Sequence, residues 1–407
     1  MEKQVNQFPE GFLFGAAVSA HQVEGGNVNS DWWWWEHLEA TPVHEPSGDA
    51  CDFYHRYGED IAMLAAFGLN AFRFSIEWAR IEPAEGEFSR AALGHYRRVL
   101  EACRDSGVRP VVTFHHFTLP RWLQDAGGFA AERFPALFER YCDRAAEALG
   151  DLIGIACTIN EPQGLGSSGF LLGINPPGHT DDREGAQKAA DNLLEAHRRG
   201  AAAIRSRAGI PVGVTLAMPD IQYEDGAQPG SSSLEVESRV IDWFLEQART
   251  DDFIGVQTYT RFRIGPEGSR SPGSDWSDLT REVNETETTT QMGYEDYPQA
   301  LGGAIRRAAK SCPGVPILVT ENGIATAHDE RRIAYMHAAL KEVRGCLAEG
   351  IDVRSYLYWS WLDNFEWGFG YAPTFGLVAV DRQTFARSPK PSAAWLGSVA
   401  RNRSLPA

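Results

Sequence analysis

The sequence predicts an α/β protein, in which eight parallel strands alternate with helices and close into one (β/α)8 TIM barrel spanning residues 1–407 as a single domain. Three observations support this prediction. Short apolar runs alternate with amphipathic stretches. The apolar runs are mostly continuous, which is typical of strands covered by helices. No G-x-G-x-x-G motif follows the first run, which disfavours an open doubly wound sheet.

The apolar runs have the length of strands and end at turn residues. We expect strands at Phe12–Ser19, Ala71–Ile76, Arg109–His116, Ile153–Asn160, Pro211–Met218, Phe253–Thr260, Pro316–Glu321 and Val353–Ser360.

Amphipathic stretches between these runs predict the helices. In Ser89–Ser106, apolar residues recur at helical spacing, Ser89 is a suitable N-cap, and Gly107 follows the last turn. The same pattern predicts helices at Glu132–Leu149, Glu184–Arg207, Leu234–Gln247, Pro298–Ser311 and Asp329–Glu349.

Two segments between the predicted elements look irregular. We expect Asp225–Ser233 to be a surface turn or short linker. Gly265–Gly293 is rich in Ser, Gly, Asp, Glu and Thr, and it is either a solvated loop or a loop that rims the catalytic face of the barrel.

Charge and composition exclude several functional classes. The chain has 38 basic and 55 acidic residues, a net charge of −17, which argues against a nucleic-acid partner. The six cysteines lack the spacing of a zinc site, so we expect buried free thiols. No run reaches the ~20 apolar residues of a membrane span. With no signal-peptide pattern near Met1, these features predict a cytoplasmic protein.

Polar residues end two of the predicted strands, where the active site of such a barrel lies. Glu161 follows one strand in T-I-N-E-P, and Glu321 ends another in V-T-E-N-G. Two carboxyl groups at one barrel mouth suit glycoside hydrolysis, which needs one to protonate the leaving oxygen and one to meet the anomeric carbon. The alternative is a pair of structural glutamates in salt bridges.

Both pentapeptides resemble the signature segments of glycoside hydrolase family 1, the β-glucosidase family. Residues 12–26 (FLFGAAVSAHQVEGG) resemble the family's G-x-A-(T/S)-(S/A)-(A/S)-(Y/F)-Q-x-E-G. Residues 51–80, 113–123 and 358–381 resemble further family segments. Six matching segments in the family's order make the resemblance specific.

The resemblance implies a retaining mechanism without a metal or organic cofactor. Glu321 would be the nucleophile, and Glu161 the acid that later acts as the base. Arg73 would hold Glu321 ionised, and Tyr259 would donate a hydrogen bond to it. An ionised Glu321 would in turn raise the pKa of Glu161.

The resemblance also implies a sugar-binding set: Gln22, His116, Asn160, Trp359, Glu366 and Trp367. The neighbouring His115 matches an aromatic position and is interpreted as packing. A metal pair with His116 is disfavoured, because adjacent strand residues point to opposite faces. We expect at most one ring of the run Trp32–Trp35 to contact a ligand.

Three departures from the family pattern concern the surroundings of the two glutamates and the loops. Gln257 replaces an asparagine at the end of the sixth strand, and Thr374 stands where the family often has arginine. Glu161 precedes Glu321 by 160 positions, fewer than is usual in the family, so shortened loops should alter the aglycone side.

The predicted function is hydrolysis of unphosphorylated β-D-glucosides, with β-galactosides and β-fucosides as further candidates. Glu366 would repel a phosphate, which argues against a phosphoglycosidase. Transglycosylation on the same intermediate, or a non-catalytic sugar-binding barrel, are the alternatives. The partner is a small β-glycoside, with no nucleic acid and no membrane, and the resemblance permits a monomer or a homo-oligomer equally.

Overall fold

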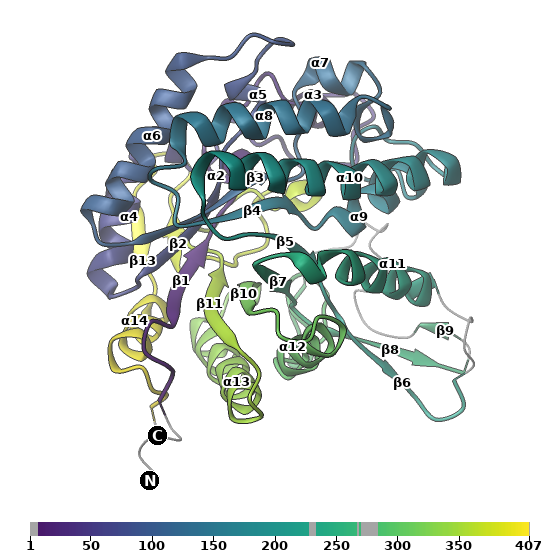
Figure 1. The fold of residues 1–407 in the computed structure, drawn as a ribbon. Coiled ribbons are helices and arrows are strands. Elements are labelled where there is room, and N and C mark those ends of the chain that lie inside the picture. The colour runs from purple at the N-terminus through teal and green to yellow at the C-terminus, as the bar shows by residue number, and fades with distance from the viewer. Residues whose placement is uncertain (1–6, 228–232, 267, 270–283, 407) are drawn as a thin grey trace.

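The computed structural model describes residues 7–227, 233–266, 268–269 and 284–406. Within these ranges, eight parallel strands close into a barrel in the order β1-β11-β10-β7-β5-β4-β3-β2 (Figure 1). They are β1 (Leu13–Ala17), β2 (Ala71–Ser75), β3 (Arg109–His115), β4 (Ile155–Asn160), β5 (Val212–Ala217), β7 (Phe253–Gln257), β10 (Ile317–Asn322) and β11 (Val353–Trp359). The predicted (β/α)8 barrel is confirmed, with each strand inside or within one residue of its predicted run.

Helices surround the barrel, and each of the six predicted ones is present. The long helices are α4 (Phe53–Phe67), α6 (Arg90–Asp105), α8 (Phe134–Leu149), α10 (Arg183–Ala208), α11 (Ser233–Gln247), α12 (Ala300–Ser311), α13 (Asp329–Ala348) and α14 (Pro391–Asn402). Ser89 caps α6, since its hydroxyl accepts the Ala92 N–H at 3.1 Å. Helices α4 and α14 were not predicted.

Short helices follow several strands at their carboxyl ends and carry part of the predicted site. They are α2 (Ala20–Val23), α3 (Asp31–Glu36), α5 (Trp78–Ile81), α7 (Arg121–Asp125), α9 (Pro162–Gly166), η2 (Ser167–Leu171) and η4 (Trp367–Phe369). All lie in the chain between a barrel strand and the helix that returns from it, or in the stretch after β11.

Two barrel strands are followed by a small second sheet, which Figure 1 shows extending away from the barrel. β6 (Asp220–Tyr223) follows β5, and β8 (Arg261–Gly265) follows β7 and pairs with β6 in parallel. Both predicted irregular segments lie partly outside the described residues. The described end of the long loop, 284–293, has no helix or strand, and Glu285 accepts a hydrogen bond from Arg331 of α13 at 2.8 Å.

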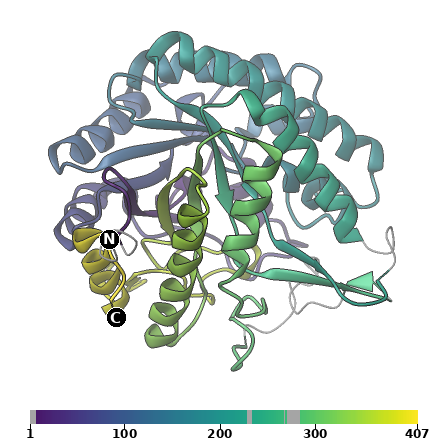
Figure 2. The same ribbon diagram turned by 60° about the horizontal axis from the view of Figure 1, so that its bottom comes forward.

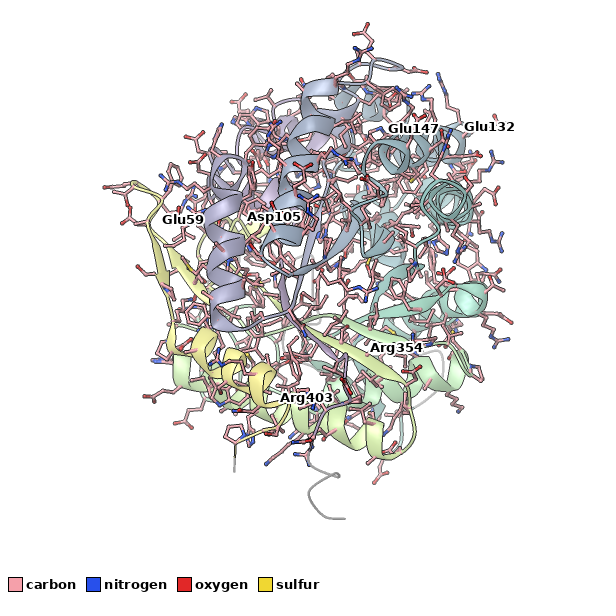
Figure 3. All side chains as sticks on the ribbon, turned by 60° about the vertical axis from the view of Figure 1, so that its left-hand side comes forward. Glu59, Asp105, Glu132, Glu147, Arg354 and Arg403 are labelled. Atoms are coloured by element: carbon pink, nitrogen blue, oxygen red, sulfur yellow. The ribbon has the colours of Figure 1, made fainter. Side chains whose placement is uncertain are left out.

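The first and last described segments of the chain lie together near the amino end of β1. The Phe8 N–H donates to the Arg403 carbonyl at 2.7 Å, and Figure 2 shows the purple first segment beside the yellow helix α14. Charged side chains such as Glu59 and Glu147 project from the outer helices into solvent (Figure 3). The six cysteines are buried free thiols, as predicted. Among the helices that the structure describes, none combines the length and apolar character needed to cross a membrane.

Candidate active site

The structure brings the predicted site residues together at the carboxyl ends of the barrel strands. Those on strands are Arg73 on β2, Asn160 on β4, Glu321 on β10 and Trp359 on β11. Those just beyond strands or on the short helices are Gln22, His116, Glu161, Tyr259, Glu366 and Trp367. Hydrogen bonds and ring contacts join them into one polar and aromatic network.

Glu321 lies within β10, with a side chain that is almost entirely buried. The Arg73 Nη1 donates a hydrogen bond to Oε1, and the Tyr259 hydroxyl donates to Oε2 at 2.6 Å. Burial raises the pKa of Glu321, and this outweighs the lowering by Arg73 and Tyr259. Burial therefore makes the carboxyl more easily protonated than the Arg73 charge alone would imply.

Arg73 is fully buried and holds more than one partner. Its Nη2 donates to the Asn160 Oδ1 at 2.6 Å, and its Nε donates to the Thr113 hydroxyl at 3.1 Å. The Thr215 hydroxyl also donates to the Asn160 Oδ1 at 3.2 Å. Sequence reasoning missed both threonines. Their signal is a threonine within a mostly apolar strand, since a buried hydroxyl needs a hydrogen-bond partner.

Glu161 stands at the junction of β4 and α9, with a left-handed backbone (φ 48°) and Pro162 at the first helical position. Such a backbone is unfavourable for a residue other than glycine, and strained residues of this kind cluster at functional sites. The Gln257 Nε2 donates to the Glu161 Oε1 at 2.7 Å, and the Gln257 Oε1 accepts from the Thr320 hydroxyl at 3.1 Å. In the sheet, Gln257 is also the backbone pairing partner of Glu321, so this residue lies next to both glutamates.

Stacked rings form one wall beside these carboxyl groups. His116 lies nearly parallel to Trp359 (5.9 Å, 19°) and to Trp367 (6.3 Å, 13°). Burial and the nearby Arg73 lower the pKa of His116 well below its usual value, so the ring is neutral. Gly323 permits this wall, because a Cβ there would lie 1.9 Å from the Trp359 carbonyl oxygen.

Gln22 and Glu366 form a second polar pair. The Gln22 Oε1 accepts from the Ser19 hydroxyl at 2.6 Å, while its Nε2 donates to the Phe365 carbonyl at 2.7 Å and to Glu366 at 3.5 Å. Burial, together with the charges of Glu321 and Glu161, raises the pKa of Glu366 to about 8. This shift favours the protonated form of Glu366, which can donate a hydrogen bond as well as accept one.

The structure shows the contacts of the histidine and tryptophan side chains whose roles the sequence left open. The His115 ring meets Phe129 edge to face at 5.5 Å, which agrees with packing. In the run Trp32–Trp35, Trp32 packs on Trp367 at 4.5 Å, and the partly exposed Trp34 lies beneath the Arg121 guanidinium. In the part of the chain that the structure describes, no three potential metal-binding side chains are grouped.

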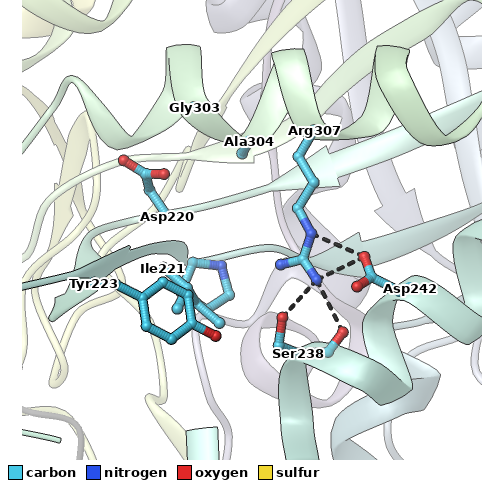
Figure 4. Close-up of a pocket in the computed structure, with 9 residues that line it drawn as sticks. Asp220, Ile221, Tyr223, Ser238, Asp242, Gly303, Ala304 and Arg307 are labelled. Carbon is cyan, nitrogen blue, oxygen red and sulfur yellow. Dashed lines mark hydrogen bonds and ion pairs between the residues drawn. The ribbon is translucent and has the colours of Figure 1, made fainter. Parts of the chain in front are cut away.

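A separate hollow of about 230 Å³ lies between β6, α11 and α12 (Figure 4). Its charged groups already have protein partners: Arg307 is bonded to Asp242 and Ser238, and Asp220 accepts from Gln222 at 2.7 Å. None of the predicted site residues lines it, so the barrel mouth is the better candidate for the active site.

Comparison with known proteins decides the family. The model of glycosyl hydrolase family 1 matches residues 4–248 and 236–405. The chain belongs to glycosyl hydrolase family 1. It is therefore a retaining O-glycosyl hydrolase, and the resemblance noted in the sequence is confirmed.

Several members of glycosyl hydrolase family 1 are similar over almost the whole chain. A thermostable β-glucosidase B from Thermobispora bispora is 32% identical, with 98% of this chain and 91% of the relative covered. The crystal structure of the β-glycosidase BGL167 superposes with a TM-score of 0.86 at 47% identity, covering 98% of both chains. The β-glucosidase from Thermotoga maritima, in complex with deoxynojirimycin, gives 0.87 at 28% identity, covering 98% and 100%.

Departures from the pattern of glycosyl hydrolase family 1 have local explanations. Gln257 still reaches Glu161, so its longer side chain keeps an amide at the carboxyl group. At the arginine position, the Thr374 N–H and hydroxyl both donate to Gln291, at 2.8 and 3.1 Å. The Thr374 carbonyl accepts from Arg332 at 2.7 Å, so this segment is held without an arginine of its own.

Proposed function

We propose that the chain is a β-glucosidase that hydrolyses unphosphorylated β-D-glucosides by double displacement, with Glu321 as nucleophile and Glu161 as acid/base. The role assignment rests on the difference between the groups that surround Glu321 and those that surround Glu161. Arg73 and Tyr259 both donate to Glu321, whereas the neutral amide of Gln257 donates to Glu161. Donors that stabilise a carboxylate suit a nucleophile that must be ionised at the start.

In the first step, a Glu321 carboxylate oxygen bonds to the anomeric carbon as the bond to the glycosidic oxygen breaks. The Glu161 carboxyl gives its proton to that oxygen, so the aglycone leaves as a neutral alcohol. The product is a glycosyl ester of Glu321. Burial and the nearby carboxyl groups keep the Tyr259 phenol protonated by raising its pKa well above the usual value, so it remains a donor.

In the second step, Glu161 takes a proton from water as the water oxygen bonds to the anomeric carbon. The ester bond breaks, and Glu321 leaves as a carboxylate that Arg73 and Tyr259 again stabilise. Esterification has removed the Glu321 charge, so Glu161 loses the neighbour that favoured its protonated form and can act as a base. Two inversions at the anomeric carbon give net retention.

The sugar would be held by the remaining predicted residues. Asn160, fixed between Arg73 and His116, would bind the 2-hydroxyl, a contact that strengthens as the transition state forms. Trp359 would face the apolar side of the sugar ring, and Trp367 would lie along its edge. Gln22, His116 and Glu366 would bind the other hydroxyls.

β-Fucosides and β-galactosides are proposed as secondary substrates. A relative from Bifidobacterium breve, 29% identical over 95% of this chain and 97% of its own length, is named a bifunctional β-D-glucosidase/β-D-fucosidase. Gln22 and Glu366 can serve hydroxyls of either orientation, because their amide and protonated carboxyl both donate and accept.

Hydrolysis of nitrophenyl β-D-glucoside, followed by NMR of the first sugar released, tests the proposal. We expect turnover with the β-anomer appearing first, and slower turnover of the β-fucoside and β-galactoside. An α-anomer appearing first would overturn the retaining assignment, and preference for a 6-phosphoglucoside would overturn the substrate. Binding without turnover would favour a non-catalytic barrel, and an acceptor titration would measure transglycosylation. Fractionation of cells would test the predicted cytoplasmic location.

A further inference from the structure

His21 occupies a position where the family pattern has tyrosine or phenylalanine. It lies in α2, directly before Gln22, and is buried. A histidine is harder to bury than either aromatic residue, because both ring nitrogens need partners. This structure supplies them, so the site around His21 is built for an imidazole.

Two polar side chains hold the His21 ring. The Asn27 Nδ2 lies 3.1 Å from Nδ1, and the Glu36 Oε2 lies 3.4 Å from Nε2. Each ring nitrogen therefore has a polar partner, an amide at Nδ1 and a carboxylate at Nε2. The Ser47 hydroxyl donates to the other Glu36 oxygen at 2.6 Å, which completes the support.

The face of the held ring lies against Trp367. The two ring centroids are 5.5 Å apart and the planes differ by 6°, so they form an offset stack. Trp367 itself has a left-handed backbone (φ 49°), which is unfavourable for a tryptophan and needs support from its surroundings. His21 and Trp32 supply ring contacts on this part of the wall.

We propose that His21 is a positioning residue for sugar binding: held by Asn27 and Glu36, it orients Trp367 against the sugar. The inference rests on the proposed function, in which Trp367 contacts the sugar in the cleaved subsite. The two hydrogen bonds prevent rotation of the imidazole about its own bond to Cβ. A phenylalanine at this position would stack on Trp367 but would have no such restraint.

The test compares H21A and H21F with H95A in the full chain. His95 is also a buried histidine, stacked on Tyr54 at 3.7 Å, and it contacts none of the site residues. H95A therefore measures the effect of removing a buried imidazole ring away from the site. The measurements are KM and kcat with nitrophenyl β-D-glucoside, and the Kd of deoxynojirimycin by calorimetry. Circular dichroism checks that each variant is folded.

We expect H21A to raise KM and Kd about 2- to 12-fold, the worth of one aromatic pair, with kcat nearly unchanged. H21F should fall between H21A and wild type, and H95A should match wild type in both constants. Folded H21A or H21F with wild-type KM and Kd would overturn the inference, as would an equal loss in H95A. If H21A does not fold, H21F decides by the same criterion.

Failure of the proposed function would look different. Wild-type protein that neither hydrolysed the glucoside nor bound deoxynojirimycin would overturn the proposed function, and this inference with it. Normal wild-type activity with unaltered H21F would overturn this inference alone.

Discussion

The two glutamates at the barrel mouth are held in opposite ways. Glu321 lies within a strand, is only 4% exposed, and accepts from a guanidinium and a phenol. Glu161 lies beyond the end of its strand, on a strained backbone, and is partly exposed. Its neutral donor, Gln257, is itself held by Thr320.

This difference fits two different chemical tasks. A nucleophile needs a fixed position and a stabilised negative charge, which a strand and charged donors provide. An acid that later becomes a base must change its protonation state and meet both the aglycone and water, which favours a more exposed position with a neutral partner. Four predictions test this contrast.

Removing the Glu321 carboxyl should have the largest effect. E321G should lower hydrolysis of the aryl glucoside by more than about 10⁴-fold, because no glycosyl ester can form. Azide or formate should then restore turnover by entering the emptied space, giving a product of inverted configuration by NMR. A rescued product with retained configuration would contradict the nucleophile assignment.

Removing the Glu161 carboxyl should have an effect that depends on the substrate. E161A should lose about 10²- to 10⁴-fold with alkyl glucosides, whose leaving oxygen needs a proton. The first chemical step with dinitrophenyl glucoside should lose far less. A leaving-group series measured under single-turnover conditions checks this, and equal loss across the series would exclude the acid role.

Arg73 should control the pH at which Glu321 becomes active. Arg73 lowers the pKa of Glu321, which burial has raised. In R73M that pKa rises further, so Glu321 stays protonated to higher pH, and the acidic limb of kcat/KM should move up by about 1 to 3 pH units. R73K keeps the positive charge and should move the limb less. An unmoved limb in folded R73M would refute the electrostatic role.

Gln257 should have the smallest effect. Q257N restores the residue that the family usually has, but its amide is one methylene shorter and should lose its contact with Glu161. We expect about a fivefold lower rate with alkyl glucosides, the worth of one hydrogen bond of about 1 kcal/mol. Q187N, at an exposed position on α10, is the matched control. A faster Q257N enzyme would show that the longer amide is a poorer fit.

The sequence predicted the barrel and named residues that meet at its mouth, because both depend on local signals. Continuous apolar runs mark covered strands, and the strand-end segments around Glu161 and Glu321 carry the family resemblance. It did not predict the residues that hold the site from other strands. The contacts of Thr113 and Thr215 depend on how distant segments align across the barrel.

The sequence also did not predict how far burial and neighbouring charges shift the pKa values of the site carboxyl groups. The pair of Arg73 and Glu321 could be anticipated from the resemblance, but the raised pKa of Glu321 reflects how completely the barrel excludes water around it. The same holds for Glu366, whose pKa of about 8 arises from burial and from two carboxyl groups that are distant in the sequence.

Arg73 connects catalysis with the integrity of the whole scaffold. Its guanidinium, on β2, donates hydrogen bonds to Thr113, Asn160 and Glu321. These bonds join β2 to three further barrel strands, β3, β4 and β10. If heating separates these strands, the hydrogen bond that Arg73 donates to the nucleophile Glu321 breaks at the same time. Heat inactivation should therefore coincide with melting of the barrel, without an earlier stage in which an intact fold has lost its catalytic power.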